Sequence, residues 1–382
     1  MGVNNRPIEE LDALVIKRAY YVLGISIAGL SLVMINWLGL SVMMYDIMTI
    51  KKIALNAVYY VVPMATAMIG FAATQLPATF LFSRLGNRIS MFLGLLFNGI
   101  SLVFSTTNSY YTALFLRFLA GMGGLGLYLM PSLLLILGWW SIRGGLTRWV
   151  QVVYLSSITI LMLLSSLMSI WLTQSVAVYL GLVSIALAIL VLLTMKDAVI
   201  IKSVSIMAVM NNPDVLMLSI AFSIPWGGTY LGMLPPLTLN VSNYLGIVEL
   251  TIPLALTPLF YRFRHSLRIE RRRVLLYLTM ALGVVVIPMG GLTKVQLFIP
   301  VIIGFIFTVI LLLTLYLVHD LVSPILIAQS TSYLFTVSSI IGSIVSMFMG
   351  YVIQYLGILG WVITGILIMT SSLIYRILKI TL

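Results

Sequence analysis

The sequence lacks cysteine and contains little charge. The absence of cysteine among its 382 residues excludes disulfides, thiolate metal sites and cysteine nucleophiles. Only 8% of the residues are charged, whereas soluble globular domains carry about a quarter. The two histidines, His265 and His319, lie far from any acidic cluster, so neither a metal site nor another cofactor is expected. No GxxxxGK[ST] phosphate-binding loop is present, so ATP is not expected to supply energy.

Apolar residues dominate instead, at 62% of the chain, with a mean hydropathy of +1.17. They form runs separated by Gly, Pro, Asn and charged residues, and about twenty apolar residues cross a bilayer as a helix. We therefore predict an all-α integral membrane protein with twelve transmembrane helices. The predicted spans are Tyr20 to Met43, Ile53 to Phe80, Ile89 to Ser105, Tyr110 to Leu137, Leu146 to Ile170, Thr173 to Thr194, Asp214 to Leu234, Asn243 to Tyr261, Val274 to Gly290, Gln296 to Val318, Ile325 to Ile353 and Leu356 to Ile377.

The basic residues predict the orientation of these spans. Seventeen of the 21 Lys and Arg residues fall on one side of the predicted membrane, three fall on the other, and Arg117 lies within a span. Short loops rich in Lys and Arg stay in the cytoplasm, so both termini are expected there, in a multi-pass protein of the plasma membrane. The net charge of +12 is spread over short loops and forms no stripe, which argues against a nucleic-acid partner.

A polar segment, Met195 to Pro213, divides the chain into two sets of six spans. We predict a first bundle at residues 1–194, a cytoplasmic linker at 195–213 and a second bundle at 214–382. Asn212, Pro213 and Asp214 form a helix-start signal for the seventh span. Each half has a basic loop after its second span, and the one at Arg262 to Arg273 is also expected to contact anionic headgroups.

Arg117 is the first candidate functional residue. A guanidinium in hydrocarbon costs at least about 2.5 kcal/mol, so it is expected to face a water-filled cavity or a partner. The alternative is that the side chain snorkels to the headgroups. At helical spacing Arg117 shares a face with Gly121, Gly124 and Tyr128. This face would bind an anion.

Glu249 is the other charge predicted within a span, and a buried carboxylate there could carry a coupled proton. The alternative places Glu249 in water at the outer interface. Four polar or amphipathic residues near mid-depth are further candidates for the solute site, although an aromatic pair four residues apart, as at 226 and 230, also occurs in ordinary packing. These candidates are Asn36, Trp226, Tyr230 and Thr308.

Three local patterns resemble the major facilitator superfamily. In the loop Leu81 to Arg88, three residues match the family's loop between its second and third helices: Arg84, Gly86 and Arg88. Ser83 stands where the family usually has an acid. Arg117 with the glycines that follow it is similar to the arginine and glycine motif of the fourth helix. In the eleventh span small residues recur every four positions: Ser338, Gly342, Ser346 and Gly350.

The resemblance implies two six-helix bundles that rock about a midplane site and expose it alternately to each side. It implies a secondary transporter for a small solute, and we expect a monomer. The Arg117 face adds a weak preference for an organic anion. The candidate gating residues are Ser83, Arg84, Gly86, Arg88, Gly121, Gly124, Gly342 and Gly350. A channel, or a membrane-embedded enzyme, is the alternative. The sequence leaves open the substrate, the direction of transport and whether a proton or sodium is coupled.

Overall fold

The computed structural model describes residues 6–39, 57–107, 109–141, scattered helical residues between 153 and 167, 172–197, 206–229, 271–290, 299–322 and 326–378. Within these residues all regular structure is helical, as predicted. Glu249, Tyr230 and most of the basic run Arg262 to Arg273 lie outside the described residues, as do the predicted eighth span and residues 198–205 of the linker.

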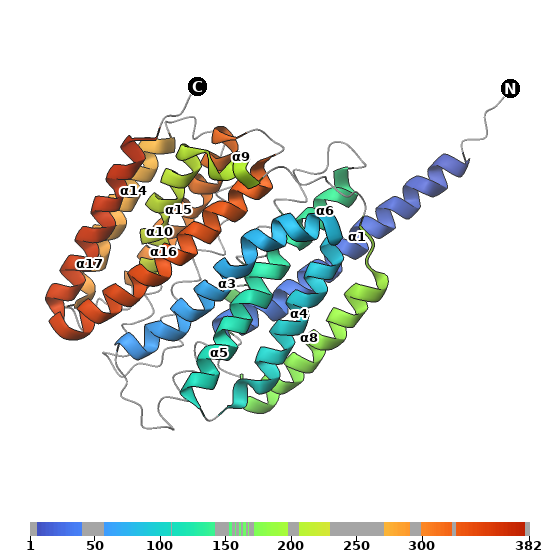
Figure 1. Ribbon diagram of the computed structural model, residues 1–382, viewed down its shortest axis with the longest axis horizontal. Helices are drawn as coiled ribbons and strands as arrows, with labels where there is room; N and C mark the ends of the chain where they lie inside the picture. The colour runs from blue at the N-terminus through green and yellow to red at the C-terminus, as the bar shows by residue number, and fades with distance from the viewer. Residues whose placement is uncertain are drawn as a thin grey trace.

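The helices of the first half gather in one bundle, coloured blue to green in Figure 1. Two of them contain π-helical segments, η1 and η3, in which the backbone is wider than an α-helix. The elements are α1 (Arg6–Met34) continuing into η1 (Ile35–Gly39), α3 (Ala57–Leu85), α4 (Asn87–Val103) with the 3₁₀ turn η2 (Phe104–Thr106), the continuous run of α5 (Tyr110–Ala120), η3 (Gly121–Leu129) and α6 (Met130–Ser141), and α8 (Gln174–Thr194).

The second bundle is built in the same way and lies beside the first (Figure 1). Its described elements are the short helix α9 (Ile206–Met210), α10 (Pro213–Thr229), α14 (Arg271–Val286) with the 3₁₀ turn η7 (Ile287–Gly290), α15 (Ile299–Leu321), α16 (Ile327–Leu356), and α17 (Ile358–Ser371) with the 3₁₀ turn η10 (Ser372–Arg376).

Eight of the described helical segments are long and apolar enough to cross a membrane. The segment α8 illustrates why, since Thr173 caps its start by accepting a hydrogen bond from Val176 N at 3.4 Å and an apolar run follows. Large apolar side chains such as Tyr179 and Leu193 are exposed on it, as expected of a surface that faces lipid. The chain is a multi-pass membrane protein.

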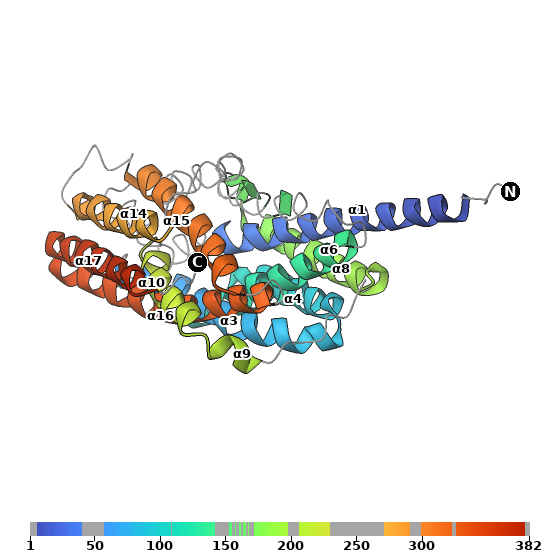
Figure 2. The same ribbon diagram turned by 90° about the horizontal axis from the view of Figure 1, so that it is seen from above.

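Ten of the twelve predicted spans coincide with described helices, and the fifth and eighth fall almost entirely or wholly outside the described residues. The predicted helix start at the seventh span is confirmed, because Asn212 Oδ1 accepts hydrogen bonds from Asp214 N at 3.0 Å and Val215 N at 3.2 Å. The first helix differs, since α1 begins at Arg6 and projects from the bundle at its N-terminal end (Figure 2). Hydropathy predicts only the part of the helix that lies in lipid, which is predicted to begin at Tyr20. The acidic residues Glu9 and Glu10 near the start of α1 stabilise the additional turns.

The bundles meet along α3 and α16, which pack against each other more extensively than any other pair of described elements (Figure 1). Small and polar residues of α16 are buried along this contact and along its contact with α10, among them Ser332, Ser338, Ser339 and Gly342. Small residues allow backbones to approach closely in a membrane, where burial of apolar surface gives helices little reason to associate. Among the described helices, these two therefore form the main contact between the bundles.

Candidate functional site

The Arg117 side chain is buried in the first bundle, with only 1% of its surface exposed. Its Nη1 donates to the carbonyl of Asn36 at 2.9 Å, and its Nη2 donates to the carbonyl of Trp37 at 3.0 Å. The guanidinium also lies 5.9 Å from the centre of the Trp37 ring and 3.8 Å from the Met64 sulfur. The side chain thus points into the protein, and it does not take the snorkelling position at the headgroups.

The two carbonyls that Arg117 contacts belong to η1, where α1 widens into a π-helix. Such widening interrupts the regular backbone hydrogen bonds, and in a membrane the released groups need partners within the protein. The charged fork of Arg117 supplies two hydrogen bonds at this point. Arg117 therefore fixes the end of the described part of the first helix, whatever else it binds.

The side chain of Asn36 faces α4 and α8, where it forms a buried polar network. Its Nδ2 donates to Asn98 Oδ1 at 2.8 Å and to Ser101 Oγ at 2.5 Å. Asn98 Nδ2 donates to Ser184 Oγ at 3.2 Å, and Ser184 donates to the carbonyl of Leu95 at 2.8 Å. The sequence analysis missed Asn98, although an asparagine inside an apolar run was the signal. Through Asn36 this network and Arg117 hold the same segment of backbone.

Neighbouring helices fill the space beside the glycines that follow Arg117. A Cβ on Gly121 would lie 1.9 Å from the carbonyl oxygen of Ala67 in α3, and one on Gly124 would lie 2.8 Å from Val33 in α1. Tyr128 donates to the carbonyl of Ser26 at 3.0 Å, and its hydroxyl fills the space over Gly29. The predicted face of Arg117, glycines and Tyr128 is, in this structure, the surface on which η3 packs against α1 and α3.

The candidates of the second bundle lie closer to the boundary. Trp226 Nε1 donates to Ser339 Oγ at 3.2 Å, and both Trp226 and Met68 of α3 border the space over Gly342. Thr308 is buried and donates to the carbonyl of Gly304 in its own helix at 2.7 Å. Gly350 is buried in the same helix as Gly342. The structure therefore brings Trp226 and Gly342 together, and places Asn36 and Arg117 inside the first bundle.

A pair of buried hydroxyls joins the bundles near the end of α3 and the start of α16. Thr79 Oγ1 lies 2.6 Å from Ser332 Oγ, and Thr79 also donates to the carbonyl of Gln75 at 3.0 Å. Thr79 is 2% exposed and Ser332 is fully buried, so water does not compete for this contact. We call this pair the hydroxyl latch. The sequence analysis did not identify it, because neither residue belongs to the matched loop motif.

Removing the hydroxyl latch is expected to favour separation of α3 from α16 near Thr79 and Ser332. Thr79→Val keeps the shape and removes the hydrogen bond, which is worth about 1 kcal/mol and corresponds to an about fivefold shift in population. A cysteine introduced at the buried Ser330 of α16 should then react severalfold faster with a water-soluble maleimide, since the native chain has no cysteine. Thr66→Val is the control, because the hydrogen bond described for the Thr66 hydroxyl goes to the carbonyl of Val62 in its own helix. Equal labelling rates in the two variants would show that the hydrogen bond between Thr79 and Ser332 does not hold the bundles together.

The carboxylate of Asp197 contacts the loop Leu81 to Arg88, in which Ser83 stands where the family usually has an acidic residue. Asp197, just after α8, accepts a hydrogen bond from Asn87 N at 2.8 Å at the start of α4. Gly86 has a positive φ of 103°, and a Cβ there would lie 2.5 Å from Asp197 Oδ2. Arg88 Nη1 lies 3.5 Å from the carbonyl of Met195. Ser83 and Arg84 belong to the last turn of α3, and their side chains lie outside the described part.

Charged and metal-binding groups are sparse among the described residues. Within that part of the chain, no three His, Cys, Asp or Glu side chains form a group that could hold a metal ion. The ion pair found there joins Arg271 at the start of α14 to Asp320 near the end of α15, and both side chains are partly exposed.

Comparison with known proteins identifies the fold. No family model matches the sequence, and no curated protein is similar in sequence. Among solved structures, the human organic anion transporter TETRAN is similar with a TM-score of 0.68 and 12% identity, over 94% of this chain and 99% of that one. A bacterial homologue of the human lysosomal transporter Spinster, inward-facing and unoccupied, is similar with a TM-score of 0.73 and 14% identity, over 94% and 96%. The chain has the twelve-helix, two-bundle fold of the major facilitator superfamily, as its motifs predicted.

Proposed function

We propose that this chain is a secondary transporter that moves a small solute by alternating access between its two bundles. The observation that carries the proposal is the boundary itself, where the described contacts of α3 with α16 include Met68 against Gly342, the ring of Phe71 beside that of Phe335, and the hydrogen-bonded hydroxyls of Thr79 and Ser332. A contact held in this way can separate at small cost, which rigid-body rocking requires. The likeness to solved transporters adds support, since each has the same fold over almost its whole length.

The solute is proposed to be a small organic anion. Arg117 is a permanent cation buried beside the broken end of α1, and its field favours negative charge in that half of the protein. An anion would reach the guanidinium by replacing one of the two carbonyls of η1. Coupling to a proton through Glu249, or to sodium, belongs to the same proposal and rests on the sequence alone.

The remaining parts of the proposal concern location and assembly. We propose a monomer in the plasma membrane, with both termini and the basic run Arg262 to Arg273 on the cytoplasmic side near anionic headgroups. The chain is proposed to be neither a channel nor an enzyme. If an impermeant reagent labels a cysteine placed at Arg268 from outside intact cells, the proposed cytoplasmic position of this run is wrong.

The function can be tested by counterflow in proteoliposomes that contain the purified chain. A panel of small organic anions, sugars and lipophilic cations should yield at least one solute whose exchange saturates, with anions preferred. Under an imposed pH difference, Glu249→Gln should abolish accumulation while exchange at equal pH continues. Flux that never saturates and shows no counterflow would indicate a channel and contradict the proposal. Accumulation that persists in Glu249→Gln would exclude proton coupling through this residue.

A further inference from the structure

Five aromatic side chains form a continuous cluster at the boundary between the bundles. We call it the ring cluster, and it consists of Phe71 of α3, Phe222 and Trp226 of α10, Phe307 of α15 and Phe335 of α16. Phe71 is the fifteenth of the 29 residues of α3 and so lies halfway along a membrane-crossing helix. The cluster therefore occupies the depth at which a transporter of this fold holds its solute.

The ring distances show that the cluster is joined throughout. Phe222 stacks on Phe307 with centroids 6.1 Å apart and planes at 17°. Trp226 lies 5.9 Å from Phe307 and 5.8 Å from Phe335. Phe335 in turn lies 6.0 Å from Phe71, which is the single ring from the first bundle. All of these separations fall in the range in which aromatic rings attract one another.

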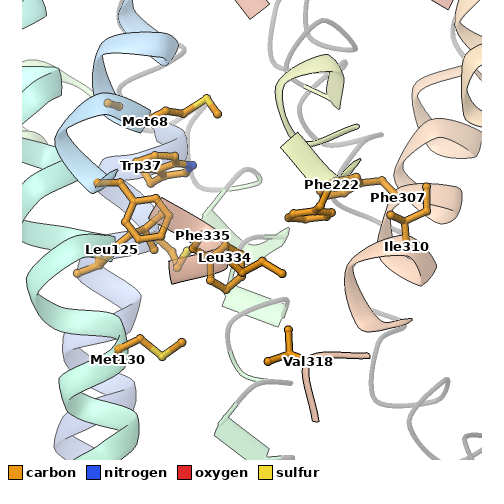
Figure 3. Close-up of a cluster of buried hydrophobic side chains, with 14 of the residues drawn as sticks. Trp37, Met68, Leu125, Met130, Phe222, Phe307, Ile310, Val318, Leu334 and Phe335 are labelled. Carbon is orange, nitrogen blue, oxygen red and sulfur yellow. The ribbon is translucent and has the colours of Figure 1, made fainter. Parts of the chain in front are cut away.

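Among the described residues, the ring contact between Phe71 and Phe335 crosses the boundary between the bundles. Figure 3 shows Trp37 and Met68 of the first bundle facing Phe222 and Phe307 of the second, with Leu334 and Phe335 between them. If the bundles rock apart, Phe71 and Phe335 must separate, and both lose the aromatic surface that they share here. A flat ring entering between them would restore that contact on both sides.

Two further features favour a solute at this place over a rigid core. Trp226 keeps part of its surface exposed, whereas Phe71 and Phe222 are at most 1% exposed, so these two phenylalanine rings are more deeply buried than the tryptophan. Met68 lies against Gly342 beside Trp226, and a methionine can adapt to ligands of different outline because its side chain is unbranched and polarizable. The rigid rings of the cluster are thus bordered by one adaptable side chain, that of Met68.

From this arrangement we infer that the solute carries a planar aromatic ring, which binds in the ring cluster between Phe71 and the four rings of the second bundle. The inference rests on the proposed transport function and narrows its substrate class to aromatic organic anions. Ring faces are electron-rich and do not attract a carboxylate or sulfonate, so the anionic end is not recognised here. The ring cluster therefore selects the ring of the solute and not its charge.

A matched pair of probes tests this selection. Benzenesulfonate and cyclohexanesulfonate carry the same permanent charge and are similar in size, but only the first is aromatic. Neither crosses a bilayer easily, because neither can become neutral near pH 7. Binding to the purified full chain is measured by thermal shift and by equilibrium dialysis of the labelled probe. We expect benzenesulfonate to bind at least about twofold more tightly, which corresponds to the lower value of about 0.5 kcal/mol for one aromatic contact.

Two variants of one helix supply the control. Phe335→Leu removes a ring of the cluster, and Phe348→Leu removes a ring of α16 that is 52% exposed. Phe335→Leu should weaken benzenesulfonate about 3- to 10-fold and bring it level with cyclohexanesulfonate, while Phe348→Leu changes neither. Equal binding of the two probes by the native chain, or no binding of benzenesulfonate, overturns the inference. If another solute then shows saturating counterflow, transport stands without the aromatic ring. Aromatic preference without any counterflow supports the ring site and contradicts the transport function.

Discussion

Replacing Arg117 with alanine is expected to weaken the apparent affinity for an organic anion at least about tenfold and to destabilise the fold by several kcal/mol. The substitution removes a buried cation and leaves the carbonyls of Asn36 and Trp37 without its hydrogen bonds. Each buried carbonyl left unpaired costs about 1–3 kcal/mol. Counterflow as a function of solute concentration gives the affinity, and thermal unfolding of the purified chain gives the stability.

The lysine variant separates charge from geometry. Arg117→Lys keeps the positive charge but has no planar fork, so it can reach one of the two carbonyls well and the other poorly. We expect a stability between those of the native chain and the alanine variant, and an anion affinity reduced by less than in Arg117→Ala. Lys17→Ala is the control, because it removes an exposed charge from α1 and should change neither quantity. If Arg117→Ala is less stable but binds anions as tightly as the native chain does, Arg117 is structural and the anion preference is wrong.

The spans could be predicted from the sequence because each depends on local composition. A run such as Thr173 to Thr194 begins at a capping residue and stays apolar for the thickness of a bilayer, and the structure has a helix at Gln174–Thr194. The helix start at Asn212 was predictable for the same reason, since the cap and the backbone groups that it satisfies are two or three residues apart.

The partners of Arg117 could not be predicted. Its acceptors are backbone carbonyls, which every residue has, so no letter of the sequence marks Asn36 and Trp37 as the ones that it contacts. The π-helical segment η1, which presents these carbonyls, has no sequence signature either. In the same way, Asn36 and Asn98 are visible as polar residues in apolar runs, but only the folded chain brings them to 2.8 Å. The sequence thus indicates which residues are unusual and leaves their partners undetermined.

Adding one methyl group at Gly121 is expected to lower the stability of the fold by an amount similar to that expected for Arg117→Ala. The new Cβ would lie 1.9 Å from the carbonyl oxygen of Ala67 and 2.9 Å from the amide nitrogen of Phe71. Both are backbone atoms, so no side chain can move aside, and η3 and α3 would have to separate along the contact that they share. Forcing extra volume into a packed interior costs about 1–3 kcal/mol and occasionally more, and we expect Gly121→Ala to fall at or above the upper end.

The control for this prediction is Gly24→Ala in α1, where a Cβ would have no atom within 4 Å. Alanine at an open helical position should keep or slightly raise the stability, since glycine in a helix costs about 0.5–1 kcal/mol relative to alanine. Thermal unfolding of both variants measures the difference, and counterflow reports whether the protein that remains folded still works. Because α3 also carries Phe71 and Thr79, a shift of α3 away from η3 would disturb both the ring cluster and the hydroxyl latch. Gly121→Ala should therefore lose transport even at temperatures at which it remains folded, and a variant with native stability and native transport would show that η3 and α3 are not in backbone contact.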